Sequence, residues 1–599
     1  FCLALLTDAS LLALASISSL KALETVNFNS LFLVPVFNVF LSLLSSPLSL
    51  FVALCSASFL RSKSFVIRGD LGAKDGFTGT PLLTSQKTTG EFGEYIDKYT
   101  IEQSVADGAT LQILYEGREV KAKVEGESLD KLFDEYFKDN MNSAREILTP
   151  LLSSLDNMGL NELNRNHSAA KKLLLRHGAT FRLNDTGLKG TERILPFDPL
   201  PRIISKHDWI TLEEGLKQRL EAIDLFLGDI YNSQNIINDG IIPRELIESS
   251  DGWRPQMLGF KPPLNKWCQI SGLDLIRDGQ GTWHVLEDNL RCPSGVAYFL
   301  ENRLVMKNIF PNLFSGRIVK PIDEYPSFLL KTLQELAIWT DTPKIVLLTP
   351  GIFNSAYFEH SYLAQEMGIQ LVQGHDLICN DEYVYLKTTS GLKRVDVIYR
   401  RIDDDFLDPI HFRKDSYLGV SGLLDVMKAG HVAVANVPGT GIADDKMIYS
   451  FVPKMIKYFL DEEPIIKNVE TYICYYEKDR EYVLKNLPKL VVKSVSEAGG
   501  YGMLIGPQST TTEINEFSDK IKNNPRNFIA QPTLELSTVP SLCDGELYPC
   551  HVDLRPYILR GKDSWVSPGG LTRVALKKGS LVVNSSQGGG CKDTWVVGN

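Results

Sequence analysis

The stretch LVVKSVSEAGGYGM, residues 490–503, joins a hydrophobic strand that ends in Lys493 to a glycine-rich loop at Gly499, Gly500 and Gly502. Glycines let backbone N–H groups approach phosphate oxygens, and a lysine ammonium neutralises the same group. The stretch therefore predicts a phosphate-binding loop made by Lys493 and the three glycines. A flexible hairpin turn with a surface lysine fits the same letters equally well, because glycine-rich loops are common.

A second stretch, VLEDN at residues 285–289, places Glu287 and Asn289 at alternate positions of a strand, where they share one face. A turn at residues 277–281 pairs this strand with one that ends at Asp274. Carboxylate and amide oxygens are ligands that magnesium prefers, and magnesium bridges nucleotide phosphates. The pattern therefore predicts a Mg²⁺ site at these three side chains. The alternative interpretation is a solvent-facing acidic strand.

Two further patterns fit a nucleotide site. Lys446 follows Asp445 at the start of a helix expected over residues 447–460, which presents a second lysine to phosphate. FIAQP at residues 528–532 is a strand with a polar hinge at Gln531, suited to hydrogen bonding with a purine edge.

Together these features resemble the ATP-grasp superfamily, with its two phosphate lysines, glycine-rich lid, adenine hinge and acidic ExN magnesium site. In the usual order the lysine and glycine loop precede the ExN strand. Here Glu287 and Asn289 come well before Lys493 along the chain. The order is permuted, as in glutathionylspermidine synthetase.

The similarity is closest to the bacterial circularly permuted ATP-grasp type 2 proteins, from about residue 130 to the C-terminus. The motifs stand here as GTERILPFDPLPR from Gly190, VLEDNLRCPSGVAYFLENR from Val285, TPGIFNSAYFEH from Thr349, YRRIDDDFLDP from Tyr399, GTGIADDK from Gly439, HVDLRPY from His551 and VNSSQGGGCKDTW from Val583.

That resemblance implies ATP and Mg²⁺ as cofactors and assigns most of the site. It implies that Lys446 and Lys493 bind the nucleotide phosphates, Gly499, Gly500 and Gly502 form the lid, Gln531 lies near adenine, and Asp274, Glu287 and Asn289 hold one or two magnesium ions.

Four arginines are catalytic candidates. Arg291 is expected to face the ExN side chains and steady a transferring phosphoryl group. Arg401 belongs to the RRIDDD cluster at residues 400–405, at a strand end where parallel sheets bind ligands, and a guanidinium can grip a carboxylate with two bonds. A self-neutralising surface ion network is the alternative for that cluster. Arg555 and Arg573 complete the set.

The resemblance implies an ATP- and Mg-dependent carboxylate–amine ligase acting on a peptide-like or amino-acid substrate. Such enzymes transfer the γ-phosphoryl group to a carboxylate, and an amine then attacks the acylphosphate to form an amide. This chemistry requires charge stabilisation and positioning rather than a side-chain nucleophile. The alternative is an ATP-binding protein without ligase turnover that acts as a nucleotide-gated partner in a complex.

Alternating helical and strand patterns predict an α/β or α+β fold for this part of the chain. We expect residues 138–342 to form the first part of the permuted ATP-grasp domain, 343–440 a small parallel-sheet subdomain, and 441–599 the part with the lysine and glycine loop. Within 343–440, strands are predicted at 344–351, 369–372, 395–400 and 431–435, with a helix at 356–367.

A packing helix is predicted to begin near Thr211, because Thr211 and Glu214 form a capping-box pattern. Its apolar residues recur at three- and four-residue steps, namely Leu212, Leu216, Leu220, Ile223, Leu227 and Ile230.

The first part of the chain differs from the rest. Residues 1–75 are rich in Leu and Ser and are not expected to form a folded domain, although the uncharged stretch 25–60 leaves a membrane anchor as an alternative. Residues 76–137, with FTGTP from Phe77, resemble a fragment of the motor subunit of type I restriction enzymes. No GxxxxGK[ST] phosphate loop precedes this fragment, so a helicase function is the least favoured. The start at Phe1 and this fragment together indicate a fused, truncated or misassigned gene product.

Bulk properties narrow the partners. A formal net charge of −10 argues against a general nucleic-acid binder, which needs a basic surface. The nine cysteines include no CxxC pair, as expected for reduced thiols in the cytoplasm. The expected partners are therefore small carboxylate and amine substrates, with neither nucleic acid nor membrane.

Overall fold

The computed structural model describes residues 66–68, 74–76, 142–182, 192–314, 319–495, 502–534, 536–576, 583 and 589–598. The chain divides into two compact units, Phe1–Val120 and Lys121–Asn599. In the first unit, β1 (Val66–Arg68) pairs antiparallel with β2 (Lys74–Gly76). Nearly all of the predicted N-terminal extension and motor-like fragment lies outside the described residues. Within the described ranges, no helix has the length and apolar character needed to cross a bilayer.

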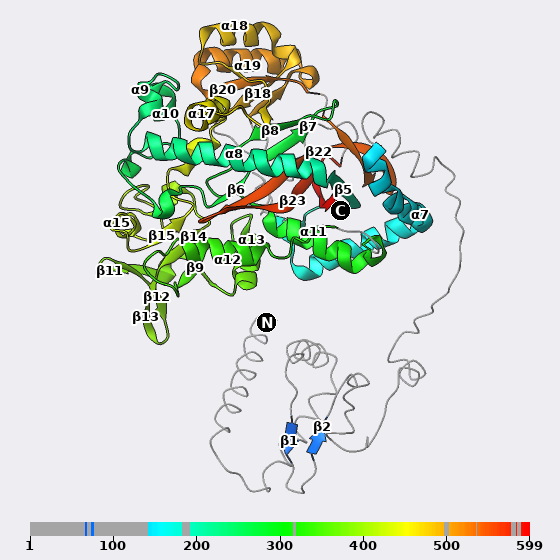
Figure 1. The fold of residues 1–599 in the computed structure, drawn as a ribbon, viewed down its shortest axis with the longest axis horizontal. Helices are drawn as coiled ribbons and strands as arrows, with labels where there is room; N and C mark the ends of the chain where they lie inside the picture. Colours follow the sequence, from blue (N-terminus) through cyan, green and yellow to red (C-terminus); the bar gives the residue numbers. More distant parts are fainter. Residues whose placement is uncertain are drawn as a thin grey trace, which may run out of the picture. The chain divides into compact units, whose positions relative to one another are not determined.

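A nine-stranded sheet forms the centre of the second unit (Figure 1). Its main path runs β16-β8-β7-β22-β23-β24-β5, and β6 and β21 also pair with β22. The strands are β5 (Phe197–Ser205), β6 (Ile270–Gly272), β7 (Asp274–Arg277), β8 (Trp283–Glu287), β16 (Lys467–Asn468), β21 (Thr538–Cys543), β22 (Glu546–Arg560), β23 (Ser564–Val574) and β24 (Gly590–Val597).

Both faces of this sheet are covered, because successive side chains of a strand point to opposite faces. On β22, Leu554 and Ile558 belong to the core that contains α8 (Lys206–Ile230). The alternate residues Tyr557 and Leu559 belong to the core that contains α11 (Val296–Ile309). The strand is therefore apolar on both faces, as a sheet between two helical layers requires.

The long helix α8 confirms the predicted apolar stripe but not the predicted start. Leu212, Leu216, Leu220, Ile223, Leu227 and Ile230 are all buried. The helix begins at Lys206, and its N-cap is Ser205, whose Oγ accepts a hydrogen bond from the Asp208 amide at 3.0 Å. The Thr211 capping-box prediction is wrong because a serine upstream already satisfies the orphan amides of the first turn.

The predicted small parallel sheet is present. Its order is β10-β9-β14-β15, and all its neighbours are parallel. The strands are β9 (Ile345–Leu348), β10 (Gln370–Val372), β14 (Val397–Arg400) and β15 (Ala433–Ala435), and α13 (Tyr357–Met367) connects the first two. An antiparallel sheet that the sequence did not reveal is inserted here, formed by β11 (Leu377–Asn380), β12 (Tyr383–Thr388) and β13 (Gly391–Val395).

A third sheet carries Lys493, in the order β17-β20-β18-β19. It consists of β17 (Tyr472–Ile473), β18 (Leu490–Ser494), β19 (Met503–Ile505) and β20 (Phe528–Pro532). It packs with α18 (Glu477–Asn486) and α19 (Thr511–Asn523) around a small core of its own that includes Val492 and Ile521. Figure 1 shows these two helices on the side of the sheet away from α8.

The helix predicted over residues 447–460 is two helices, α16 (Lys446–Tyr449) and α17 (Val452–Leu460). Pro453 lies in the first turn of α17, has no N–H to donate and would clash with the Tyr449 carbonyl in a continuous helix. That carbonyl instead accepts a hydrogen bond from Asn468 Nδ2 at 2.9 Å.

The remaining elements complete the unit. They are α7 (Asn142–His177), β3 (Thr180–Arg182), β4 (Glu192–Ile194), α9 (Asn235–Asn238), α10 (Arg244–Glu248), α12 (Tyr325–Glu335), α14 (Asp404–Leu407) and α15 (Leu423–Lys428).

A buried ion pair between neighbouring strands β24 and β5 of the large sheet gives a stability prediction. Lys592 Nζ lies 2.5 Å from Asp198 Oδ2, and both side chains have 0% exposure. Lys592→Met leaves Asp198 buried and uncompensated, so the free energy of unfolding should fall by about 3–5 kcal/mol. Urea denaturation measures the change, with the largely exposed Lys331→Met as control. A loss no larger than in the control would contradict the prediction.

Candidate functional site

A cavity of about 1340 Å³ lies where segments from all parts of the second unit meet. Its described lining includes the segment that follows β8, the Ser249–Arg254 loop, the Asp444–Lys446 turn, Arg526, and Arg555 with Arg573. The cavity therefore brings together most of the cations and acids that the sequence pattern singled out from distant positions.

The two predicted phosphate lysines lie near Glu287. Lys446 Nζ is 3.7 Å from Glu287 Oε2, and Lys446 lines the cavity. Lys493 does not line it directly; its Nζ donates to Gln531 Oε1 at 2.7 Å. β18 continues through Lys493 to Ser494. Lys493 is only partly exposed, which disfavours the surface-lysine interpretation.

Burial lowers the pKa of Lys493 to about 8; Glu287 opposes the shift and Lys446 reinforces it. A group with this pKa is partly neutral just above pH 8, whereas a nucleotide phosphate would favour its charged form. An anion bound beside Lys493 at alkaline pH would therefore favour uptake of a proton.

Gln531 does not line the larger cavity. It belongs to β20 next to β18, and its Nε2 donates to Thr471 Oγ1 at 3.0 Å. Thr471 lines a second cavity of about 430 Å³. The arrangement is compatible with a purine nearby, and the predicted role of Gln531 stays a prediction.

The predicted hairpin is confirmed: β7 and β8 pair antiparallel, with Asp274 opposite Glu287, although β7 begins at Asp274 and does not end there. β8 ends at Glu287, so Asn289 lies in the following loop, and the expected strand face shared by 287 and 289 is wrong. Asn289 Nδ2 is buried and has no hydrogen-bond partner among the described residues. Its amide is therefore not used by the local structure.

Asp274 is the anchor of a buried arginine network. Its Oδ1 lies 2.5 Å from Arg555 Nε, and its Oδ2 lies 2.8 Å from Arg555 Nη2 and 2.5 Å from Arg573 Nη2. Arg573 also pairs with Asp553. Burial alone would raise the pKa of Asp274, but the two guanidinium groups hold this pKa well below its usual range. A cation at Asp274 would have to share these oxygens with the arginines, so its role as a magnesium ligand stays a prediction.

The oxygens of Glu287 and Asn289 fit a magnesium ion better. Glu287 lies 3.7 Å from Lys446 and 3.8 Å from Arg555, both beyond hydrogen-bond distance. Within the described part of the chain, no cluster of three or more His, Cys, Asp or Glu could hold a metal. A cation here would therefore depend on the Asn289 amide and on oxygens of a bound nucleotide as well.

Arg401 directly follows the carboxyl end of β14, as predicted, but its guanidinium is already paired within the fold. It is buried and lies outside the cavity lining, with Nη1 donating to the Pro293 carbonyl at 2.6 Å and Nη2 to Glu359 Oε1 at 2.8 Å. Glu359 in turn accepts the amides of Gly295 and Ala297 at the start of α11. In this structure Arg401 supports the loop that enters α11, rather than presenting two donors to a substrate.

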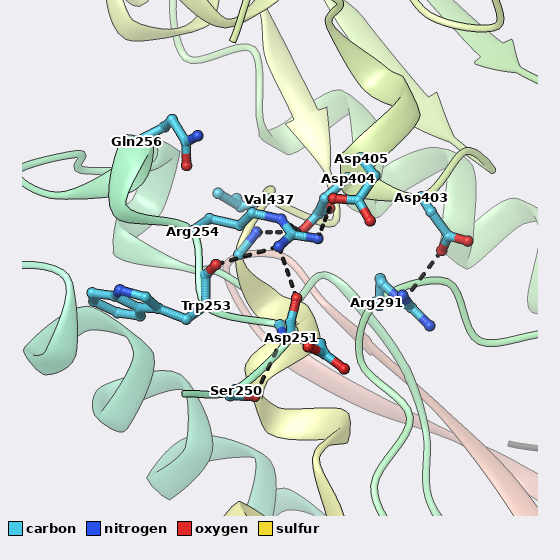
Figure 2. Close-up of polar contacts among 12 residues, drawn as sticks. Ser250, Asp251, Trp253, Arg254, Gln256, Arg291, Asp403, Asp404, Asp405 and Val437 are labelled. Carbon is cyan, nitrogen blue, oxygen red and sulfur yellow. Dashed lines mark hydrogen bonds and ion pairs between the residues drawn. The ribbon is translucent and has the colours of Figure 1, made fainter. Parts of the chain in front are cut away.

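Each of the three aspartates of the RRIDDD cluster pairs with an arginine, and Figure 2 shows Asp403 beside Arg291 and the other two aspartates beside Arg254. The ion pairs are Asp403 with Arg291 at 3.3 Å, Asp404 with Arg400 at 2.6 Å, and Asp405 with Arg254 at 2.8 Å. The arrangement favours the ion-network interpretation, although the Arg400–Asp404 pair is buried rather than on the surface.

Arg254 was not found by sequence reasoning. It comes from the loop after α10, lines the cavity and donates to the Asp251 carbonyl at 2.7 Å, as Figure 2 shows. The neighbouring Trp253 stacks on Tyr231 with ring centroids 4.7 Å apart. No spacing pattern marks this loop, since its partners lie far away in the sequence.

Asp444 is a second residue that the sequence did not single out, although it lies within the GTGIADDK motif. Its Oδ1 accepts the Leu290 amide at 2.7 Å, and Arg291 Nε lies 3.8 Å from its Oδ2. Burial raises the pKa of Asp444 to about 7, against the opposing effect of Arg291. Both Asp444 and Arg291 line the cavity, which agrees with the predicted position of Arg291 beside the ExN segment.

Comparisons with known proteins give the class. Residues 201–575 match the family described as circularly permuted ATP-grasp type 2. An uncharacterised protein of Synechocystis sp. (strain ATCC 27184 / PCC 6803 / Kazusa) is 56% identical over 451 residues, which cover 75% of this chain and 93% of the relative. The chain belongs to the circularly permuted ATP-grasp type 2 family.

Other relatives and folds are more distant. A putative glutamate–cysteine ligase of Frankia alni is 39% identical over 471 residues, covering 78% of this chain and 53% of the relative. A glutathione synthetase-like effector of Globodera pallida, solved in its apo form, has a TM-score of 0.50 at 13% identity and covers 72% of this chain and 96% of its own. At this identity the likeness shows the fold alone. Residues 73–146 match the SWI2/SNF2 ATPase family, which overlaps the predicted motor-like fragment.

Proposed function

We propose that this protein is an ATP- and Mg²⁺-dependent carboxylate–amine ligase that acts on a peptide-like or amino-acid substrate. The observation that carries the proposal is the cavity itself, in a chain of the ATP-grasp family. Its lining brings together Lys446, Glu287, Asn289, Arg555 and Arg573. These groups supply positive charge and oxygen ligands without a covalent nucleophile.

In this proposal Lys446 and Lys493 would hold the nucleotide phosphates, and Glu287 with Asn289 would hold magnesium, with Asp274 beside them. Bound Mg·ATP would supply the transferable phosphoryl group. Gly499 and Gly500 of the proposed lid lie outside the described residues. Gly502 has a φ of 62°, in the left-handed region that favours glycine, so the loop enters β19 in a conformation other residues rarely adopt.

The charges along the cavity suit amino-acid substrates. Arg291, Arg555 and Arg573 can bind carboxylate or phosphoryl oxygens, while Asp251, Asp403, Asp405 and Asp444 on the same lining can bind ammonium groups. The name of one relative, a putative glutamate–cysteine ligase, supports ligation of substrates of this class.

The chain's own contribution to catalysis would be electrostatic. Charge on the transferring phosphoryl group and on the developing acylphosphate is stabilised by fixed cations, which do not have to reorganise during the reaction. The ion pairs to Asp274 and Asp553 hold Arg555 and Arg573 in place before a substrate arrives. Binding the acid and the amine side by side would also make their reaction effectively unimolecular, which lowers its entropic cost.

The experiment that tests the proposal is ADP release from Mg·ATP with pools of amino acids, short peptides and amines. We expect release that requires both an acid and an amine, together with an amide product found by mass spectrometry. ATP binding without such turnover would overturn the ligase proposal and point instead to a nucleotide-gated partner in a complex.

The lowered pKa of Lys493 gives a pH prediction for the nucleotide. An ammonium with a pKa of about 8 in the free protein is mostly charged at pH 7 and about nine-tenths neutral at pH 9. Affinity for a non-hydrolysable ATP analogue should therefore fall about tenfold from pH 7 to 9, with uptake of nearly one proton at pH 9. Calorimetry in buffers of different ionisation enthalpy measures both quantities. In Lys493→Arg the profile should be flat, and an equally steep profile there would contradict the assignment.

A further inference from the structure

Arg526 connects the sheet that carries Lys493 to the rest of the unit through three hydrogen bonds. It lies between α19 and β20. Its Nε donates to Ser249 Oγ at 2.8 Å, and its Nη2 donates to the Leu246 carbonyl at 2.9 Å and to Asp445 Oδ2 at 2.8 Å. All three acceptors lie outside the sheet that carries Lys493, so the guanidinium spans two parts of the fold.

Asp445 connects Arg526 to Lys446, the first of the two predicted phosphate lysines. Its Oδ1 accepts the Met447 amide at 2.8 Å and so caps α16, the helix that begins at Lys446. Its Oδ2 also accepts from Ser250 Oγ at 2.8 Å, the serine on the cavity loop in Figure 2. Asp445 is 7% exposed, so little water is available to replace a lost partner.

The backbone completes the connection to the second lysine. The Lys446 amide donates to the Val495 carbonyl at 3.3 Å, and the Val495 amide donates to the Asn527 carbonyl at 3.1 Å. Val495 lies two positions after Lys493, and Asn527 directly follows Arg526. Backbone hydrogen bonds therefore connect the Lys446 segment to the strand segment that follows Lys493. The Arg526 guanidinium connects the same two parts of the fold through Asp445.

We propose that Arg526 is a positioning residue that fixes the spacing between Lys446 and Lys493, and thereby prepares both for the phosphates of one nucleotide. The inference rests on the proposed ATP site. Arg526 lines the cavity, but its one unbonded donor, Nη1, is buried away from solvent. The residue therefore acts through Asp445 rather than by touching the ligand.

A double-mutant cycle with Lys446 tests this role. Arg526→Met should weaken binding of a Mg-loaded, non-hydrolysable ATP analogue about tenfold in calorimetry, since charged hydrogen bonds to a buried carboxylate are lost. If Arg526 acts through the Lys446 segment, Arg526→Met with Lys446→Met should bind no more than about twofold more weakly than Lys446→Met alone. Losses that multiply in the double variant would overturn the inference.

A second readout uses the protein without nucleotide. Hydrogen exchange of peptides covering 444–449 should be at least about tenfold faster in Arg526→Met, since the Asp445 cap loses its partner. Arg526→Lys, which keeps one charged donor, should lie between wild type and Arg526→Met, and it serves if the Met variant does not fold. The control is Arg413→Met, which removes an exposed ion pair with Asp415 at a residue outside the cavity lining.

The two readouts separate the two proposals. If the wild-type protein binds no nucleotide while exchange at 444–449 responds as expected, the proposed function fails. The hydrogen bonds of Arg526 then only stabilise the fold. If nucleotide binds but neither affinity nor exchange changes in Arg526→Met and Arg526→Lys, the positioning role of Arg526 is refuted and the ATP site is untouched.

Discussion

Glu287→Gln should lower turnover at least about 10³-fold, equivalent to about 4 kcal/mol of transition-state stabilisation. The amide has nearly the shape of the carboxylate but carries no charge for magnesium, which prefers hard anionic oxygens. Glu287 lies beyond hydrogen-bond distance of Lys446 and Arg555, and a glutamine amide can still donate to the Asp274 carboxylate in place of the Glu287 side chain, so the change costs little in folding. The expected signature is a large rise in the magnesium concentration needed for half-maximal rate, measured by ADP release.

Nucleotide affinity without magnesium provides the internal comparison for this variant. It should stay within about threefold of wild type or rise, because Lys446 loses the competing carboxylate at 3.7 Å. Glu382→Gln, on a largely exposed glutamate away from the cavity lining, is the matched control and should behave as wild type. Unchanged turnover and magnesium dependence in Glu287→Gln would show that the metal is not held here.

Local patterns predicted the elements of this fold well where the residues that form them are neighbours in sequence. The β7–β8 hairpin placed Asp274 opposite Glu287, because a tight turn fixes the register of the two strands. The parallel sheet followed from apolar runs that alternate with a helical pattern. In both cases the pattern that predicts each element lies within a short stretch of sequence.

The errors arose where a local signal competed with a nearby one. Ser205 caps α8 before Thr211 can, and Pro453 divides the predicted second-lysine helix. Asn289 leaves the strand because β8 ends two residues earlier. Each error shifts a boundary while the expected element remains, which is where propensity reasoning is weakest.

The chemistry of the arginines could not be predicted, because their partners are distant along the chain. Arg401 matched the pattern of a substrate ligand, yet Glu359, on a separate helix, fixes it inside the fold. Arg254 and Arg526 carried no motif at all, and their roles depend on Asp405 and Asp445. Such long-range pairs follow from the packed topology and not from spacing.

Arg573→Met should lower both turnover and stability, the first by at least about 10³-fold and the free energy of unfolding by about 3–5 kcal/mol. Arg573 bridges Asp274 and Asp553, whose side chains are 0% and 2% exposed. Burial already raises the pKa of Asp553 with Arg573 beside it, and the variant removes the main opposing charge. A carboxyl group with a raised folded-state pKa stabilises the fold as pH falls. The stability deficit in urea denaturation should therefore be smaller at pH 5 than at pH 8.

Removing the orphaned carboxylate as well separates folding from chemistry. In Arg573→Met with Asp553→Asn, the buried charge left by the first change is gone, so at least half of the lost unfolding free energy should return. Turnover should not return, because the cation that faces the cavity is still absent. Recovery of both would mean that Arg573 acts only through the stability of the sheet. Recovery of stability alone would mean that its charge is needed for the reaction and that Asp553 serves to hold it there.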